Sequence, residues 1–274
     1  MTQQTQKVHI SQVGGNWTYI PPNTIIETLK EILTKNGSNI KSTTYNIRAA
    51  ELQQIFDNFY ESTLSKLTPT IQMYFGMKFI KQESAEEKRI GILTIVKNLD
   101  FLTINYIEDF NRIIDSYIPD WNTCDAFSNK VLGPLVKKSD DFANKIAEWK
   151  ESGKLWRMRS CCIAFVNLAK VGAMTELSFE ICAQCLKSSE RFVQLGVGCL
   201  LREMSLMHSE SVVEFITQNF RYFSREGLRY SIDKLNADVR KKILSLGKRK
   251  GPSGNLTDTL QTIGDCGDET CDLK

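Results

Sequence analysis

A tryptophan and an aspartate stand four residues apart near the middle of this chain, in the stretch 121–125. In a helix this spacing places Trp121 and Asp125 one turn apart on the same face. An aromatic ring beside a single negative charge attracts a cationic group and stabilises positive charge that develops nearby. A second cluster, residues 155–160, contributes Arg157 and Arg159, and a guanidinium binds phosphate through two parallel hydrogen bonds. The two clusters together indicate chemistry on a damaged nucleotide.

The same spacing also fits a simpler arrangement. Tryptophan is most often a packing residue, so Trp121 could anchor its helix to the core while Asp125 remains a surface charge. On spacing alone this alternative is the more common one. Additional features of the chain are needed to favour the chemical interpretation.

Composition indicates a folded protein that keeps its thiols reduced. The chain has 274 residues, of which 42% are hydrophobic, enough for one large domain or two small ones. Its eight cysteines include the neighbours Cys161 and Cys162 in an apolar run, and residues 1–7 lack the apolar region of a secretory signal. No apolar stretch approaches the ~18 residues of a membrane span. We expect a soluble monomer, nuclear or cytoplasmic, with no membrane contact.

Charge is distributed unevenly along the chain. Residues 1–136 hold 13 lysines and arginines against 14 acidic residues, whereas residues 137–250 hold 21 against 13, a net charge of +8. A basic region of this kind is expected of a surface that meets a polyanion, although a solvated helical face is the alternative. Residues 251–274 hold 1 basic and 5 acidic residues. This composition predicts a disordered acidic tail.

The apolar pattern predicts helices almost throughout. Apolar residues recur at steps of three and four, the helical period, in the ranges 25–33, 50–60, 90–99, 163–168, 179–186 and 197–204. Polar or glycine-containing breaks separate these ranges at 36–38, 83–85, 138–141, 151–153 and 187–189. The spacing predicts an all-α fold, an α-solenoid of HEAT-like antiparallel helix pairs, with a plain helical bundle as the alternative.

We therefore divide the chain into three parts. Residues 1–22, which end at Pro21-Pro22, are expected to form an irregular N-terminal segment. Residues 23–246 form the helical repeat domain, and residues 247–274 form the disordered acidic tail. Stacked helix pairs curve and produce a long concave face. Trp121, Asp125 and Arg159 fall on consecutive helical units and could share such a face.

Several short blocks from Tyr45 to Leu244 give this chain a recognisable pattern. They are Tyr45-Asn46-Ile47-Arg48-Ala49-Ala50-Glu51-Leu52, Glu87-Lys88-Arg89-Ile90-Gly91-Ile92-Leu93, Trp121-Asn122-Thr123-Cys124-Asp125, Trp156-Arg157-Met158-Arg159-Ser160, Val197-Gly198-Cys199-Leu200-Leu201-Arg202-Glu203 and Ser224-Arg225-Glu226. In these blocks and in their order the chain resembles the DNA alkylation repair family of HEAT-like DNA glycosylases.

The resemblance implies a protein that holds duplex DNA, alkylated or distorted, on a concave basic face. It also implies excision of N-alkylated purines of the 3-methyl or 7-methyl type, through a sugar with oxocarbenium character. By position, Trp121 would be an aromatic contact to that sugar and Asp125 the carboxylate that stabilises its charge. Arg159 would hold the DNA backbone. The remaining arginines in the matching blocks, also expected to bind DNA, are Arg157, Arg202 and Arg225. No metal or organic cofactor is implied.

Two departures from the family weaken the case for catalysis. Cys199 stands where the family has a second tryptophan, and Leu195 stands where a basic residue is common. A thiol offers little π surface, so one wall around a cationic sugar would be missing. If that contact supplies ~1–2 kcal/mol, the rate would fall by about 5–30-fold. A DNA-binding solenoid without catalysis, or a protein-interaction scaffold, therefore stands as an alternative to a hydrolase.

The cysteines do not form a complete zinc motif in the sequence. Cys182 and Cys185 have C-x-x-C spacing, but the other pair, Cys266 and Cys271, lies in the predicted tail. A structural zinc site needs four ligands, and the motif falls in an apolar helical stretch. We interpret these thiols as buried structural residues.

Overall fold

Helices make up nearly all of the regular structure, which confirms the predicted all-α class. The structure, a computed structural model, describes residues 9–11, 17–19, 22–41 and 43–246. The helices are α1 Pro22–Asn36, α2 Ala49–Ser62, α3 Pro69–Ile80, α4 Ala85–Val96, α5 Ile107–Tyr117, α6 Trp121–Phe127, α7 Gly133–Lys138, α8 Asp140–Ala147, α9 Leu155–Ala164, α10 Val166–Ala169, α11 Thr175–Cys185, α12 Arg191–Met204, α13 Ser209–Asn219, α14 Arg225–Ser231 and α15 Ala237–Ser245. Short 3₁₀ turns lie between several of them, including η2 Leu99–Phe101, η5 Glu148–Glu151 and η6 Phe220–Tyr222. No helix of the described part has the length and apolar character needed to cross a membrane.

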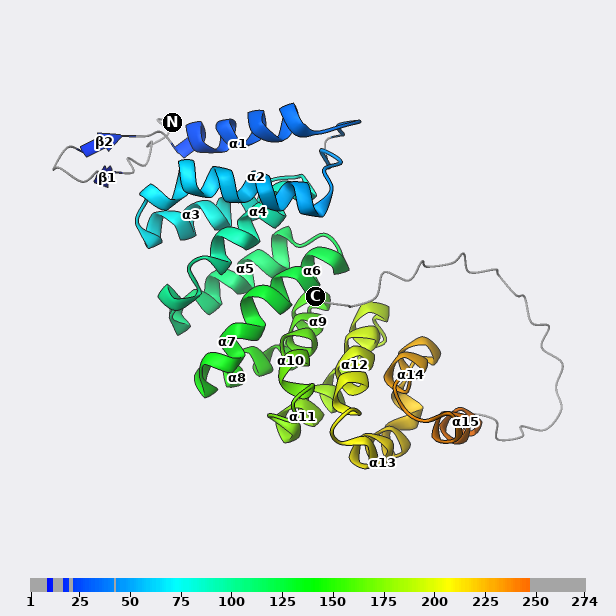
Figure 1. Cartoon of the computed structure of the whole chain (residues 1–274). Coiled ribbons are helices and arrows are strands. Elements are labelled where there is room, and N and C mark those ends of the chain that lie inside the picture. Colours follow the sequence, from blue (N-terminus) through cyan, green and yellow to red (C-terminus); the bar gives the residue numbers. More distant parts are fainter. Residues whose placement is uncertain (1–8, 12–16, 20–21, 42, 247–274) are drawn as a thin grey trace.

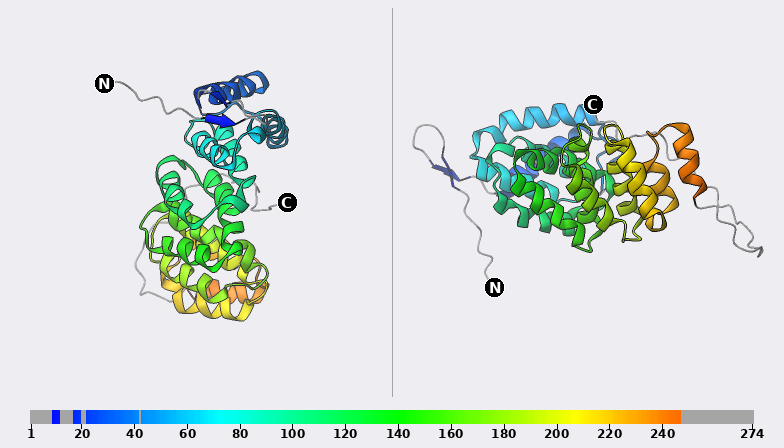
Figure 2. Two further views of the ribbon diagram at one scale, coloured as in Figure 1. Left: turned by 90° about the vertical axis from the view of Figure 1, so that its left-hand side faces the viewer. Right: turned by 90° about the horizontal axis from the view of Figure 1, so that it is seen from below.

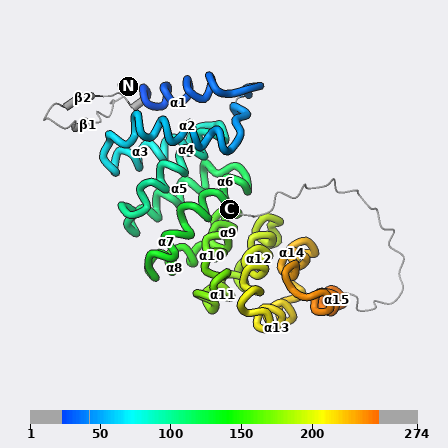
Figure 3. Tube along the Cα trace, in the orientation of Figure 1, coloured from blue at the N-terminus to red at the C-terminus, as the bar shows by residue number. Residues whose placement is uncertain are grey.

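The helices stack in chain order into a curved, elongated body (Figures 1 and 2). One row, α4, α6, α9, α12 and α14, packs helix against helix along its length, and Figure 1 shows the later members of this row on the inner side of the curve. Helices α5, α7, α8, α11 and α13 lie on the outer side, and the tube view follows the same succession (Figure 3). The inner row therefore carries both predicted chemical clusters, because 121–125 is in α6 and 155–160 is in α9.

The breaks predicted from sequence fall at helix ends. Helix α1 ends at Asn36, and α7 and α8 are separated by Ser139, whose side chain accepts a hydrogen bond from the Phe142 amide. Ser84 caps α4 in the same way through the Glu87 amide, and Glu87 returns the contact to the Ser84 backbone. Such reciprocal caps satisfy amides that have no partner in the first turn. Local sequence is thus sufficient to fix these boundaries.

The N-terminal segment contains more order than the sequence suggested. Two three-residue strands, β1 His9–Ser11 and β2 Trp17–Tyr19, pair antiparallel with His9 opposite Tyr19. The expected irregular segment therefore includes a backbone ladder, and α1 begins at Pro22, where a proline is tolerated because a first-turn amide needs no partner. The predicted acidic tail, 247–274, lies outside the described residues.

A π-helical turn follows directly after the first chemical cluster. Residues Ser128–Leu132 form this turn and connect α6 to α7. Pro134 stands in the first turn of α7. It has no amide hydrogen, and its ring would clash with the carbonyl four residues earlier in a regular helix. The wider turn relieves that clash, and such π-bulges are frequent at functional sites.

Helix α4 links the two hydrophobic cores of the described chain. Ile90 and Leu93 pack with the N-terminal core formed with α1–α3, whereas Ile92 and Ile95 pack with the larger core that continues to α15. Its close contact with α3 depends on Gly91. A Cβ atom at this position would lie 2.5 Å from the Gly76 carbonyl oxygen and 2.8 Å from the Ile80 amide nitrogen.

Replacing Gly91 by alanine should therefore destabilise the fold. Backbone atoms block the added methyl, so α3 and α4 must separate, at a cost of about 1–3 kcal/mol. Gly133→Ala is the matched control, since its Cβ would meet no atom closer than 3.4 Å. The helical preference of alanine should leave that variant neutral or stabilise it by about 0.5–1 kcal/mol. Urea unfolding measures both, and equal midpoints would contradict the close-contact argument.

Candidate active site

Asp125 of α6 and Arg159 of α9 form a buried ion pair. Arg159 Nε donates to Asp125 Oδ1 at 2.7 Å, and Arg159 Nη2 donates to Asp125 Oδ2 at 2.8 Å. Arg159 Nη1 also donates to the Phe192 carbonyl of α12 at 2.8 Å. Asp125 is 7% exposed and Arg159 is 5% exposed. The pair thus joins three successive helices of the inner row.

Neighbouring contacts fix the orientation of α6 against α9. Asp120 caps α6 by accepting from the Thr123 amide at 2.8 Å. One residue before the carboxylate, Cys124 Sγ lies 3.2 Å from Ser160 Oγ, the hydroxyl that follows Arg159. Burial raises the pKa of the Cys124 thiol to about 12. Cys124 therefore serves as a neutral packing residue and not as a nucleophile.

Burial and pairing act in opposite directions on the two charged groups. Burial raises the pKa of the Asp125 carboxyl, whereas the hydrogen bonds and charge of Arg159 lower it, with a net rise above its ordinary value. For Arg159, burial lowers the pKa, but the hydrogen bonds and charge of Asp125 outweigh this and leave it raised. Asp125 therefore depends on Arg159 to remain ionised in this environment, whereas a guanidinium stays protonated.

Trp121 lies on the same helix one turn before Asp125 and is 38% exposed. This is unusual for so large an apolar side chain. If Trp121 were only a packing residue, its indole would be buried and the Asp125 carboxylate would be exposed. Here the carboxylate is covered and the indole is open to solvent.

Cys199, which the sequence resemblance aligned with a family tryptophan, provides almost no exposed surface. It lies in α12 and is 2% exposed. Its thiol is close enough to the guanidinium groups of Arg159 and Arg202 to interact with their charges. Cys199 is therefore a buried neighbour of the ion pair.

The arginines predicted to bind DNA differ in how they are engaged. Arg159 is engaged by Asp125, as described above. Arg157 forms a two-point ion pair with Asp115 of α5, in which Arg157 Nε lies 2.7 Å from Asp115 Oδ1. Arg202 pairs with Asp233 at 3.1 Å, and its guanidinium lies 5.3 Å from the Tyr230 ring centroid. Arg225 at the start of α14 is exposed, and no hydrogen bond or ion pair of its side chain occurs among the described residues. Arg225 is thus the member of this set best placed to meet an external phosphate.

An aromatic pair beside the site was not anticipated from sequence. The Trp156 and Phe192 rings lie 5.5 Å apart between α9 and α12, and the Phe192 carbonyl is the acceptor that orients Arg159. Phe192 is seven residues before Cys199, which places both on one face of α12. The seven-residue spacing could have shown from sequence that Phe192 and Cys199 share a helix face. Only the fold shows that this face packs against α9.

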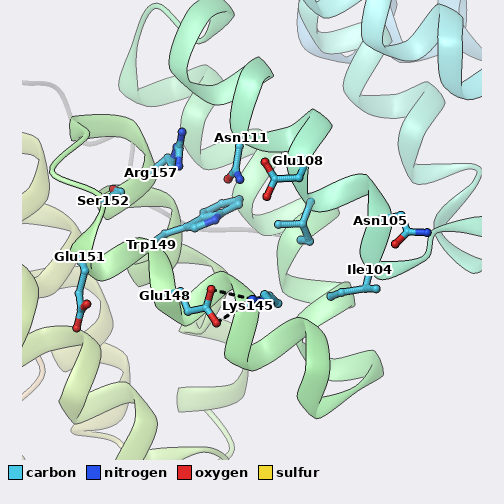
Figure 4. Close-up of a pocket in the computed structure, with 11 residues that line it drawn as sticks. Ile104, Asn105, Glu108, Asn111, Lys145, Glu148, Trp149, Glu151, Ser152 and Arg157 are labelled. Atoms are coloured by element: carbon cyan, nitrogen blue, oxygen red, sulfur yellow. Dashed lines mark hydrogen bonds and ion pairs between the residues drawn. The ribbon is translucent and has the colours of Figure 1, made fainter.

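A pocket of about 530 Å³ lies next to Arg157 but apart from the ion pair. Trp149 forms its floor, with Asn111 and Glu108 above it and the Lys145–Glu148 ion pair at its edge (Figure 4). Asp125 is not among the lining residues. The lining combines acidic and basic side chains, which does not match the uniformly basic surface expected for a DNA backbone.

Comparisons with known proteins agree on one family. The family model described as DNA alkylation repair enzyme matches residues 30–235. A solved structure named as a predicted DNA alkylation repair enzyme from Enterococcus faecalis is similar to this chain, with a TM-score of 0.63 and 15% identity over 78% of this chain and 96% of the other. No curated protein matches. The family model spans both chemical clusters and the row of helices that carries them.

Removing one charge of the buried pair should be costly. Asp125→Asn would leave the Arg159 guanidinium buried beside a neutral amide, which should lower the free energy of unfolding by about 3–5 kcal/mol. Asp115→Asn breaks the two-point pair with Arg157, the other arginine of α9. The side chains of this pair are 22–23% exposed, so the loss should cost about 1 kcal/mol or less. Denaturant unfolding of both variants tests this. Similar losses in the two would show that burial does not set the cost.

Proposed function

Because the chain belongs to the DNA alkylation repair enzyme family, we propose that it is a DNA glycosylase that removes N-alkylated purines from duplex DNA. Membership of the family gives the protein a role in DNA repair, with DNA as its substrate or partner. The finer proposal names the reaction as hydrolysis of the bond between a 3-methyl or 7-methyl purine and its sugar. The protein would act as a monomer, without a metal in the reaction.

One observation carries the proposal: a carboxylate fixed by a buried arginine lies one helical turn from an exposed indole. A carboxylate has about four lone-pair directions, and Arg159 occupies two of them. The others remain for a developing positive charge or for a water molecule. A carboxylate held in place needs no reorganisation when charge develops beside it, and this is the source of electrostatic catalysis.

The reaction follows from the charge of the lesion. An N3- or N7-methylated purine is already cationic, so it leaves as a neutral base and takes the bonding electron pair with it. The sugar then carries the positive charge, which Asp125 stabilises. Water adds to the sugar carbon and its proton passes to solvent, leaving an abasic site. No general acid is needed, because the leaving group requires no protonation.

Aromatic surface would complete the site around the cationic sugar. The exposed Trp121 ring offers a π face to positive charge, and the half-buried Phe192 ring packs against Trp156 of α9. Phe192 could take over part of the role of the tryptophan that Cys199 replaces. Of these two rings, Trp121 is the one exposed enough to meet an intact duplex without movement of the protein.

The DNA would lie along the inner row of helices. Arg225 at the far end of the row offers an exposed guanidinium, and Lys154, directly before α9, is also exposed. Charges of this kind bind phosphates without regard to base sequence. Arg159 would contribute indirectly, by orienting Asp125, since both of its donor edges are already engaged.

Binding without excision is the second candidate, and Cys199 is the observation that favours it. A buried thiol supplies no aromatic wall, so a bound sugar would have less stabilisation than the family pattern provides. In that case the protein would recognise distorted or alkylated DNA and leave the base in place.

Release of methylated purines from methylated duplex DNA distinguishes the two. Wild type should exceed spontaneous loss, and Trp121→Ala should reduce the rate by about 5–30-fold, since a cation–π contact is worth ~1–2 kcal/mol. Asp125→Asn should reduce it by about 100-fold or more. Phe101→Ala removes another exposed aromatic ring, in η2, and should leave the rate unchanged. If the wild-type protein binds methylated duplex DNA but releases no methylated purine, the proposed glycosylase activity is rejected and binding without excision is supported.

Arg225→Gln should weaken binding to all duplex sequences equally. Loss of one phosphate contact should reduce the dependence of log affinity on log salt concentration by about 1. The control is Arg112→Gln in α5 on the outer side, where the arginine is exposed and paired with Asp109. Fluorescence anisotropy at several salt concentrations gives both slopes. An unchanged slope for Arg225→Gln would place the DNA elsewhere.

A further inference from the structure

Three thiols meet inside the protein behind the candidate site. Cys161 and Cys162 of α9 and Cys185 of α11 have sulfur atoms that all lie within 4.8 Å of one another. The Cys161 and Cys185 sulfurs are 3.9 Å apart, and all three residues are fully buried. At most 24 residues separate them in the sequence. Each lies in an apolar stretch of sequence, and that pattern does not predict that the three thiols meet.

The distance between two of these sulfurs matches that of thiolates around one metal ion, and all three lie within 4.8 Å of one another. A zinc–sulfur bond is about 2.3 Å long, so two sulfurs on one ion are ~3.8 Å apart in a tetrahedral site and ~4.0 Å in a trigonal one. A disulfide would require about 2.05 Å. The observed 3.9 Å between Cys161 and Cys185 agrees with a shared ion.

We propose that Cys161, Cys162 and Cys185 form a binding site for a soft, closed-shell cation, Zn²⁺ or Cu⁺. Thiolates select such ions over Mg²⁺ or Ca²⁺, which require oxygen ligands. Binding exchanges each thiol proton for a metal–sulfur bond and changes no oxidation state. The donor set is all sulfur, and these three thiols are the only group of this kind among the described residues.

Charge favours Zn²⁺, whereas the number of ligands favours Cu⁺, because a structural zinc site takes four ligands and three thiolates complete a trigonal Cu⁺ site. Three thiolates leave a net charge of −1 with Zn²⁺ and −2 with Cu⁺, and a buried net charge is costly without a partner. The positive charge of Lys150, in η5, lies near enough to Cys185 to interact with its thiolate. With Zn²⁺ this lysine, whose Nζ also lies 3.9 Å from the Glu180 carboxylate, partly offsets the remaining negative charge.

The site would stabilise the helix that positions Asp125. Arg159 precedes Cys161 by two residues in α9, so a metal that ties α9 to α11 restrains the backbone carrying the guanidinium. The ion would be structural, remote from the DNA surface, and would take no part in base excision. This role is independent of whether the protein excises bases.

The test is metal content of the full-length protein. The chain is expressed in medium supplemented with zinc or with copper, purified without oxygen in the presence of a chelator, and analysed by native mass spectrometry. Wild type should retain one ion per chain, and the ion retained identifies the preferred cation. Cys161→Ser and Cys185→Ser should lose it, and zinc-bound wild type should melt at a higher temperature than either variant.

Two controls make the result specific. Cys124→Ser changes another buried thiol, on α6, and should keep the ion. The double change Cys266→Ser and Cys271→Ser removes the two C-terminal thiols and should also keep it. X-ray absorption of the wild-type protein should show sulfur neighbours at about 2.3 Å, a measurement that needs no variant to fold. Three results would each reject the site. They are a wild-type protein that binds neither ion, a Cys185→Ser variant that retains the ion, and a metal coordination shell that contains no sulfur.

Discussion

The buried ion pair between Asp125 and Arg159 is the interaction on which the candidate site depends. Removing two charges from water is expensive, and close geometry with additional hydrogen bonds must compensate for it. The two-point contact and the further bond to the Phe192 carbonyl supply that compensation. In doing so they fix α6, α9 and α12 relative to one another. The arrangement that stabilises the pair is also the one that would orient the carboxylate for the proposed chemistry.

The packing of the surrounding helices fixes the position of this ion pair. Gly91 allows α4 to approach α3 closely, and α4 in turn packs against α6 in the inner row. Directly after Asp125, the π turn at Ser128–Leu132 absorbs the conflict created by Pro134. Behind the site, Gln194 donates to the carbonyls of Leu186, Ser188 and Tyr222, which holds α12 against the start of α14.

Positive charge in the sequence did not translate directly into positive surface. The segment 137–250 carries a net charge of +8, yet Arg157, Arg159 and Arg202 are engaged by carboxylates of the chain itself. A guanidinium that already has an acidic partner has less to offer a phosphate. A composition count cannot distinguish paired from free arginines, since the partners of these three lie 31 to 42 residues away. Arg225 is the predicted contact whose availability the fold supports.

The sequence by itself determined the helical class, the main breaks and the placement of Trp121 and Asp125 on one helix face. These properties depend on residues a few positions apart, through the helical period and caps such as Ser84 and Ser139. Only the tertiary structure decided that Arg159 pairs with Asp125, that Cys199 is buried and that Cys161 meets Cys185. Each of these contacts joins different helices, and apolar periodicity states which face of a helix is buried but not which helix covers it.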